Sequence, residues 1–151
     1  MLSRAICEQE GLGPMRLDVL VPASPVRTVT GRALHLLEPI SFWGGVSSTE
    51  GTLSDPRCAQ HGESIAGRVL FIRELRGSSS GSSVLLELAY RHRAPSAIVL
   101  SEADAILALG ALVAREMEWP APGIFRLPAG QQGAIPEGIE VSIEPDGTVS
   151  F

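Results

Sequence analysis

The spacing of apolar and polar residues changes several times along the chain, and each change predicts a new element. Residues 15–21 alternate apolar and polar side chains, and residues 26–37 form a longer apolar stretch interrupted by Gly31, so both segments are predicted strands. Residues 38–64 contain a series of turn signals, namely Pro39, Gly44-Gly45, Gly51, Asp55-Pro56 and Gly62, which predicts an irregular region. The first part of the chain is therefore expected to supply two strands and a long connection.

The middle of the chain alternates short apolar runs with helical periods. Residues 65–72 and 97–100 are compact apolar runs, as in buried strands. A Gly/Ser-rich loop at residues 77–83 precedes the first helix, and Ser101 and Asp104 are predicted to form a capping box for the second. The stripes expected to face the core are Val84, Leu85, Leu88 and Ala89 in the first helix and Ala105, Ile106, Leu109, Val113 and Met117 in the second.

Three more strands are predicted at residues 123–127, 139–143 and 148–151. Because strands and helices alternate in the middle of the chain, part of the sheet is expected to be parallel, with helices on one face. The remaining strands would form a second sheet or close a small barrel. We therefore predict the α/β class: a single domain of three layers, β/β/α, over residues 15–151, preceded by a loosely attached leader at residues 1–14.

Composition narrows the function. The formal net charge of -5 argues against a nucleic-acid partner, because phosphate binding needs clustered basic side chains. All 12 basic residues are arginine, which excludes a Schiff-base or P-loop lysine, and the lack of lysine and asparagine suggests a GC-rich genome.

The chain carries no visible targeting or membrane signal. Its N-terminus has no apolar signal-peptide core, and the longest mostly apolar run, residues 105–114, is shorter than the ~20 residues of a membrane span. We expect a cytoplasmic protein with no membrane partner, in which Cys7 and Cys58 are reduced thiols.

The strongest candidate for a ligand site is the loop at residues 76–83, which reads RGSSSGSS and lies between an apolar run and an amphipathic helix. Backbone N–H groups at a helix N-terminus lack partners, and the helix dipole favours an anion there. The two glycines let a ligand approach the backbone. A plain serine-capped helix start is the alternative, although one or two serines would suffice for it. The residues alone leave both open.

Other segments carry weaker signals. Residues 41–46, SFWGGV, are typical of a tight turn packed against an aromatic ring, with the Trp43 indole as the expected anchor. Cys58 and His61 could supply two metal ligands, but structural zinc and iron–sulfur sites usually need three or four, so we predict an ordinary loop. Residues 62–69 lack a P-loop lysine, and residues 80–82 lack the Gly-x-Ser-x-Gly elbow of many serine hydrolases.

Taken in order, several motifs resemble the small subunit of the aconitase X family. They are residues 38–46 (EPISFWGGV), Thr49 to Gly51 followed by Asp55, Gly62 with residues 67–70 (GRVL), residues 76–82 (RGSSSGS), residues 94–99 (APSAIV) and residues 104–107 (DAIL). The resemblance runs from about Val19 to Pro120. One departure stands out: the family often has a His-Pro pair shortly after the aspartate, where this chain has Arg57, Cys58 and Ala59.

The resemblance implies a swivelling β/β/α domain that works with an aconitase X large subunit, or with a fused domain, that binds an iron–sulfur cluster. No metal or other cofactor is expected in this chain. The first serine after the loop glycine, Ser78, is implied to be the catalytic base. The further residues predicted to bind substrate are Gly44, Gly45, Arg76, Gly77, Ser79, Ser80 and Ser82.

The implied reaction is dehydration of a small hydroxy acid, and two activities of the family are cis-3-hydroxy-L-proline dehydratase and phosphomevalonate dehydratase. We expect the former, because the composition suggests a bacterium and Arg76 is the only arginine in the serine-rich loop. A phosphorylated substrate would need a dedicated basic site. The rival prediction is a non-catalytic ligand-binding domain with the same fold.

Overall fold

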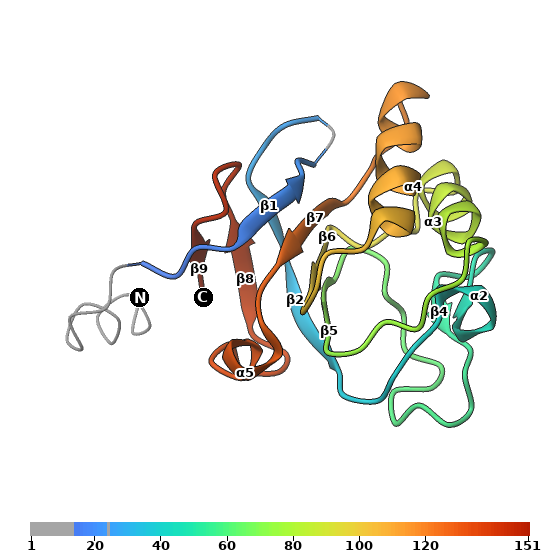
Figure 1. Ribbon diagram of the computed structural model, residues 1–151, viewed down its shortest axis with the longest axis horizontal. Coiled ribbons are helices and arrows are strands. Elements are labelled where there is room, and N and C mark those ends of the chain that lie inside the picture. The colour runs from blue at the N-terminus through green and yellow to red at the C-terminus, as the bar shows by residue number, and fades with distance from the viewer. Residues whose placement is uncertain (1–13, 24) are drawn as a thin grey trace.

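Seven strands form one mixed sheet in the computed structural model, which describes residues 14–23 and 25–151 (Figure 1). Their order across the sheet is β1-β7-β6-β5-β2-β8-β9. The strands are β1 (Asp18–Val21), β2 (Val29–Leu36), β5 (Val69–Ile72), β6 (Ala97–Leu100), β7 (Gly123–Arg126), β8 (Glu140–Ile143) and β9 (Val149–Ser150). The other elements are the hairpin of β3 (Val46–Ser47) and β4 (Thr52–Leu53), and the helices α2 (Phe42–Gly45), α3 (Gly81–Tyr90), α4 (Ala105–Glu116) and α5 (Ala129–Gln132).

The central strands β2, β5, β6 and β7 are parallel and end level with one another. Leu36 of β2 pairs with Ile72 of β5, Ile72 pairs with Leu100 of β6, and Leu100 pairs with Arg126 of β7. The loops that follow these strands therefore leave the sheet along one edge, the carboxyl edge. In α/β sheets this is the edge at which ligands usually bind.

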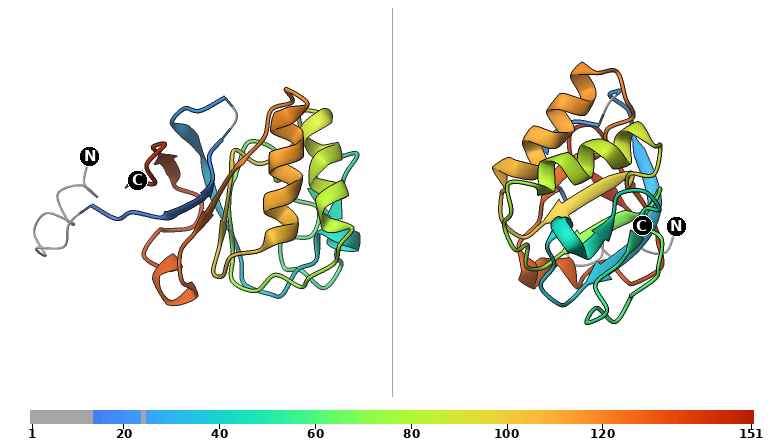
Figure 2. Two further views of the ribbon diagram at one scale, coloured as in Figure 1. Left: turned by 45° about the horizontal axis from the view of Figure 1, so that its top comes forward. Right: turned by 90° about the vertical axis from the view of Figure 1, so that its right-hand side faces the viewer.

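The antiparallel strands curl the sheet until its two ends meet. β1 pairs with β7, β8 with β2, and β9 with β8. Leu17, just before β1, donates its N–H to the Gly147 carbonyl (2.9 Å), and Val149 of β9 donates its N–H to the Met15 carbonyl (3.0 Å). The sheet thus forms a half-barrel, with α3 and α4 packed together on the other face of its central strands (Figure 2).

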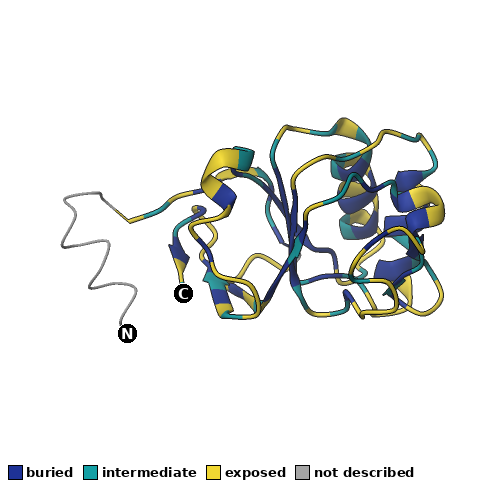
Figure 3. Ribbon diagram, turned by 90° about the horizontal axis from the view of Figure 1, so that it is seen from below, coloured by how far each residue is buried: buried dark blue, intermediate teal, exposed yellow. Residues whose placement is uncertain are grey.

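Both faces of the central strands are buried, in two separate clusters (Figure 3). Leu70 and Ile98 face the cluster under α3 and α4, whereas Phe71 and Val99 face the inside of the half-barrel. Burial on both faces explains why β5 and β6 are continuously apolar rather than alternating. The predicted single domain with β/β/α layers is confirmed, and the two ends of its sheet come together rather than forming a second sheet.

The predicted core-facing stripe is correct for α3 and wrong for α4. The buried residues are Val84, Leu85, Leu88 and Ala89 in α3 and Leu107, Gly110, Ala111 and Ala114 in α4. Leu109 and Val113 of α4, and Met117 just after it, are exposed. Gly110 shows the reason, because a Cβ atom there would lie 2.9 Å from the carbonyl oxygen of Ser82. Only the small-residue face of α4 lets the two helices approach this closely.

The predicted capping box of α4 is also wrong. The N-cap is Asp104, whose Oδ2 accepts the N–H of Leu107 at 2.8 Å. The Ser101 hydroxyl instead donates to the carbonyl of Arg73. Since Ser101 follows β6 and Arg73 follows β5, this bond ties two loops of the carboxyl edge together.

Short elements escaped the sequence analysis. Residues 38–64, predicted to be irregular, contain α2 and the β3–β4 hairpin, and α5 was not predicted. In α5, the buried Gln132 amide donates to the carbonyls of Ile72 (3.2 Å) and Leu127 (3.0 Å) at the carboxyl edge. Apart from Pro14, the predicted leader at residues 1–14 lies outside the described residues. Within the described part of the chain, no helix has the length and apolar character of a membrane span.

Candidate functional site

Two of the sequence-predicted loops meet at the carboxyl edge of the sheet. The loop after β2 carries the Phe-Trp-Gly-Gly sequence of α2, and the loop after β5 carries the serines. Ile40 donates its N–H to the Glu74 carbonyl (3.1 Å), and Arg76 donates its N–H to the Ile40 carbonyl (2.8 Å). These bonds extend the pairing of β2 and β5 by a single bridge between Ile40 and Leu75. The two loops are therefore held side by side by backbone hydrogen bonds.

The serine-rich loop forms a tight turn into α3. The hydroxyl oxygen of Ser78 accepts the N–H of Ser80 at 3.3 Å, and the Ser78 carbonyl accepts the N–H of Gly81 at 2.9 Å. Ser80 is the N-cap residue, and its side chain makes no capping hydrogen bond. The Ser78 oxygen consequently lies beside the N-terminus of α3, where the helix dipole is positive.

Two other serines of the loop serve the helix itself. The hydroxyl of Ser82 donates to the Ser79 carbonyl (3.0 Å), and the hydroxyl of Ser83 donates to the Ser80 carbonyl (2.7 Å). Such local bonds stabilise the first turn of a helix. Ser82 and Ser83 therefore have a structural role, in agreement with the alternative of a plain serine-capped helix start. The Ser78 hydroxyl does not donate to a carbonyl of this turn.

The aromatic anchor of the Phe-Trp-Gly-Gly turn is Phe42, not Trp43 as predicted. Phe42 is 2% exposed and belongs to the cluster under α3 and α4, whereas Trp43 is 63% exposed. A Cβ atom at Gly81, the first residue of α3, would lie 3.7 Å from Phe42 Cβ. Gly44 has a φ of +84°, a conformation that favours glycine, and space is open around it. The turn therefore buries Phe42 and turns Trp43 outward.

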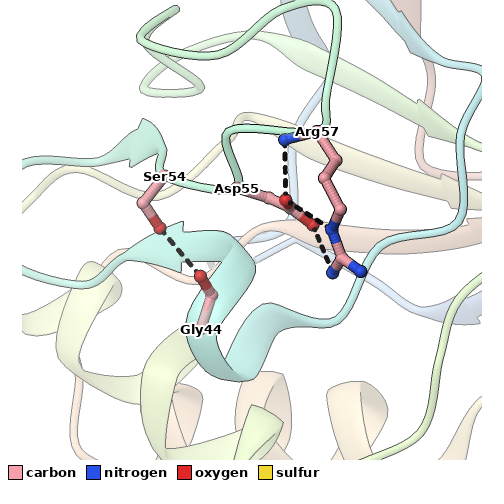
Figure 4. A network of polar contacts seen from close by, with 4 residues as sticks. All are labelled: Gly44, Ser54, Asp55 and Arg57. Carbon is pink, nitrogen blue, oxygen red and sulfur yellow. Dashed lines mark hydrogen bonds and ion pairs between the residues drawn. The ribbon is translucent and has the colours of Figure 1, made fainter.

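A hollow of about 290 Å³ lies between this turn and the residues after β4. It is lined by Pro39, Ser41, Trp43, Gly44, Gly45, Asp55, Pro56, Arg57 and Arg76. The Ser54 hydroxyl donates to the Gly44 carbonyl (3.1 Å), and the Ser54 N–H donates to the Gly45 carbonyl (3.0 Å). These bonds hold the segment after β4 against the turn, which brings Asp55 and Arg57 to the site (Figure 4).

Asp55 and Arg57 form a paired ionic contact in the wall of the hollow. Nε of Arg57 lies 3.1 Å from Oδ1 of Asp55, Nη2 lies 3.1 Å from Oδ2, and the Arg57 backbone N–H donates to Oδ1 at 2.9 Å (Figure 4). The hydrogen bonds from Arg57, with a smaller contribution from the positive charge of Arg76, lower the pKa of Asp55 below its ordinary value. Asp55 is thus held as a carboxylate.

The predicted site residues separate into three groups. Gly44, Gly45 and Arg76 line the hollow, and Gly77 and Ser78 line an adjoining crevice of about 10 Å³ together with Arg76. Arg76 thus connects the two spaces. The predicted site residues that line neither space are Ser79, Ser80 and Ser82.

Two features of the site were not predicted from the sequence: the ion pair of Asp55 with Arg57, and the outward position of Trp43. The sequence shows that Asp55 and Arg57 are two residues apart in a turn-rich segment, but it does not show that this segment lies against the Phe-Trp-Gly-Gly turn.

The Cys58–His61 segment has the geometry of an ordinary turn. The His61 N–H donates to the Cys58 carbonyl (3.1 Å), and the buried Cys58 thiol donates to Gln60 Oε1 (3.2 Å). Gln60 in turn donates to the His35 carbonyl (2.9 Å). Among the described residues, no three His, Cys, Asp or Glu side chains converge as metal ligands would. These residues therefore do not fit an iron–sulfur cluster or a structural zinc ion.

The fold and the site together define a class of protein: an α/β half-barrel domain with a serine-rich helix start and an arginine-lined hollow at the carboxyl edge of its sheet. The chain belongs to the aconitase X swivel domain family, whose family model matches residues 23–151. The match includes the C-terminal strands after Pro120, where the sequence motifs were weak.

Similar proteins come from bacteria and archaea. The chain is 45% identical to the cis-3-hydroxy-L-proline dehydratase of Pseudomonas aeruginosa over 100 residues, which is 66% of this chain and 17% of that protein. It is 35% identical to the phosphomevalonate dehydratase small subunit of Methanothermobacter thermautotrophicus over 122 residues, which is 80% of this chain and 89% of that one. The crystal structure of Thermococcus kodakaraensis aconitase X in its holo-form superposes with a TM-score of 0.76 at 26% identity, covering 91% of this chain and 97% of that one.

Proposed function

We propose that this chain is the small subunit of an aconitase X-type hydro-lyase and that, with a large subunit, it dehydrates a hydroxy acid. The observation that carries the proposal is the position of Ser78, whose hydroxyl lies at the positive end of α3 and shares a crevice with Arg76. Family membership supports it, because the similar proteins are named as dehydratases or dehydratase subunits.

The proposed chemistry assigns one proton transfer to Ser78. Dehydration of a β-hydroxy acid removes the Cα proton and the Cβ hydroxyl, and the electron pair of the C–H bond forms the new double bond. A serine hydroxyl is a poor base unless its alkoxide is stabilised. Ser78 Oγ already accepts the Ser80 N–H, the dipole of α3 favours negative charge there, and Arg76 lines the same crevice.

Ser82 is the weaker candidate for the base. Its hydroxyl proton is directed to the Ser79 carbonyl, and it lies one residue inside α3. Removing that proton would cost the first turn of the helix a hydrogen bond. Among the described residues, the Ser78 hydroxyl accepts a hydrogen bond and donates none.

The acceptor for the departing hydroxyl is assigned to the partner chain. A leaving hydroxide needs a Lewis acid, and the described residues of this chain do not fit the ligand set of one. We therefore propose that the large subunit carries an iron–sulfur cluster, while this chain supplies the base and part of the substrate cradle.

The chain purified alone is expected to contain no stoichiometric iron and to show no dehydratase activity. Metal analysis and a dehydration assay on the isolated chain measure both. The matched preparation is the tagged chain purified from its own host, in which a larger, cysteine-rich subunit, iron and activity should appear together. Stoichiometric iron or turnover in the isolated chain would overturn the two-subunit proposal. A chain that purifies alone from its host and binds a ligand without turnover would favour the non-catalytic rival.

As substrate we propose cis-3-hydroxy-L-proline. In support, the P. aeruginosa relative of that activity has the higher identity, 45% against 35% for the archaeal phosphomevalonate dehydratase small subunit. The second candidate, mevalonate 5-phosphate, is favoured by a different observation: the archaeal small subunit matches over 89% of its length, as an equivalent separate chain would.

Assaying the assembled enzyme with both compounds side by side decides between these substrates. We expect efficient dehydration of cis-3-hydroxy-L-proline and at least a hundredfold lower kcat/KM for mevalonate 5-phosphate, because a site that lacks the partners of a substrate's charged group discriminates by about this much or more. Efficient turnover of mevalonate 5-phosphate with none of the hydroxyproline would reverse the assignment.

A further inference from the structure

Neither the sequence motifs nor the proposed mechanism assigns a role to Arg57. It begins the segment Arg57 to Ala59, where the family often has a His-Pro pair, and its side chain is 81% exposed. An exposed arginine usually samples many conformations, but this one is fixed by two side-chain contacts to Asp55, at 3.1 Å each. The Asp55 carboxylate, only 15% exposed, is the anchored partner of the pair.

The way in which Asp55 holds Arg57 leaves the outer end of the guanidinium available. The Asp55 carboxylate contacts Nε and Nη2 of the Arg57 guanidinium and makes no contact with Nη1. A guanidinium has five N–H donors, so three remain, two of them on Nη1. Within the described residues these three donors have no hydrogen-bond partner. An arginine fixed in this way presents a preformed fork for a planar anion.

The hollow gives this fork a second positive group and room for a ligand. Arg76 lines the same hollow of about 290 Å³ and also the crevice of Ser78, so the hollow and the proposed base share one positively charged residue. Gly44 also lines the hollow, and the space where a side chain would lie is open there. The charged groups that line the hollow are Arg57, Arg76 and Asp55, which leaves a net charge of plus one. That balance suits a monoanion such as a carboxylate, whereas a phosphate dianion would also meet Asp55.

We propose that Arg57 binds the carboxylate of the substrate through the outer edge of its guanidinium, and that Asp55 is the positioning residue that holds it in place. This inference rests on the proposed dehydratase function, and it adds a substrate-binding residue outside the serine-rich loop.

The test uses the assembled two-subunit enzyme with the variants Arg57→Gln and Asp55→Asn. Arg57→Gln is expected to raise KM for cis-3-hydroxy-L-proline by about 10-fold to 100-fold, the usual effect of losing a charge-assisted hydrogen bond, with kcat changed by less than about threefold. Asp55→Asn should raise KM less, and the double variant should be no worse than Arg57→Gln, because both act through one contact. Additive effects of the two substitutions, an unchanged KM, or a fall in kcat alone would overturn the assignment.

The matched control is Arg16→Gln. Arg16 is also an exposed arginine paired with an aspartate, Asp146, but this pair lies where the two ends of the sheet meet, away from the carboxyl edge. The Arg16→Gln substitution removes the same charge as Arg57→Gln and should leave KM unchanged. If the control raises KM as much as Arg57→Gln does, the effect is one of net charge and the proposal is wrong.

Calorimetry with L-proline, which carries the carboxylate but no hydroxyl to lose, separates this inference from the proposed function. We expect L-proline to bind the assembled protein and Arg57→Gln to weaken this binding at least tenfold. Inorganic phosphate should not compete with L-proline for Arg57. Arg57-dependent binding without turnover of any hydroxy acid would overturn the dehydratase proposal alone. Turnover with binding that ignores Arg57, or binding by phosphate instead, would overturn the carboxylate site alone. Absence of both binding and turnover would overturn both.

Discussion

Replacing Ser78 with alanine is expected to lower kcat of the assembled enzyme by about a thousandfold, within the usual range for loss of a general base. The reason is local. The Ser78 oxygen is an acceptor at the N-terminus of α3, where an alkoxide would be stabilised, whereas the hydroxyls of Ser82 and Ser83 donate to carbonyls of the first turn. Steady-state kinetics of the purified complex measure the effect.

The folded structure should survive the Ser78→Ala change. Ser78 is half-buried in the turn, and the alanine variant loses one long hydrogen bond, 3.3 Å, to the Ser80 N–H. We expect a loss of about 1 kcal/mol in the free energy of unfolding. Turnover of Ser78→Ala within a few-fold of wild type would show that Ser78 is not the base, and Ser82→Ala would be the next variant to measure.

Ser83→Ala is the matched control for Ser78→Ala. It removes a hydroxyl from the same stretch of chain, but that hydroxyl donates to the Ser80 carbonyl and serves the helix. We expect a similar loss of stability and a kcat within about threefold of wild type. Comparing the two variants separates chemistry from damage to the first turn of α3.

The central sheet could be predicted from the sequence because its signal is local and redundant. β6 spans the same residues as the predicted strand, 97–100, since a short apolar run that ends at turn residues has few alternatives. In α3 the large apolar residues are also the buried ones, so periodicity gave the correct face. The alternation of strands and helices then predicted the β/β/α layers, and the family resemblance implied the same arrangement.

The buried face of α4 could not be predicted, because it is set by how closely α3 and α4 approach each other and not by the hydrophobicity of the side chains. Gly110 lies against the backbone of Ser82, and this contact leaves no room for a large side chain. A count of apolar residues gives Leu109 and Val113 more weight than Gly110, although both are exposed. The information needed is a tertiary distance, which a single sequence does not carry.

The site was predicted in part for a similar reason. Arg76, Gly77 and Ser78 are adjacent in the chain, so their grouping required only that one loop be recognised. Arg57 reaches the same place through the β3–β4 hairpin and through the bonds of Ser54 to the Phe-Trp-Gly-Gly turn. The register of a two-residue strand has almost no sequence signature. The contact of Asp55 and Arg57 with the predicted loops therefore emerged only from the structure.

Phe42→Ala is expected to be the most destabilising change at the site, with a loss of about 3–5 kcal/mol in the free energy of unfolding, which is the usual cost of removing a buried aromatic ring. Phe42 is 2% exposed, and it packs into the cluster that α3 and α4 cover, next to the first residue of α3. Urea denaturation followed by circular dichroism measures the loss. The slope with denaturant should stay unchanged if the variant remains two-state.

Trp43→Ala is the matched control, because it removes the larger aromatic ring from the very next residue. Trp43 is 63% exposed, so its truncation should change the free energy of unfolding by less than about 0.5 kcal/mol. The pair of variants tests which ring anchors the turn. A packed indole, as the sequence favoured, predicts the opposite order, with Trp43→Ala the more damaging change. A large loss for Phe42→Ala with none for Trp43→Ala places the anchor beneath the turn and leaves the indole exposed at the edge of the hollow.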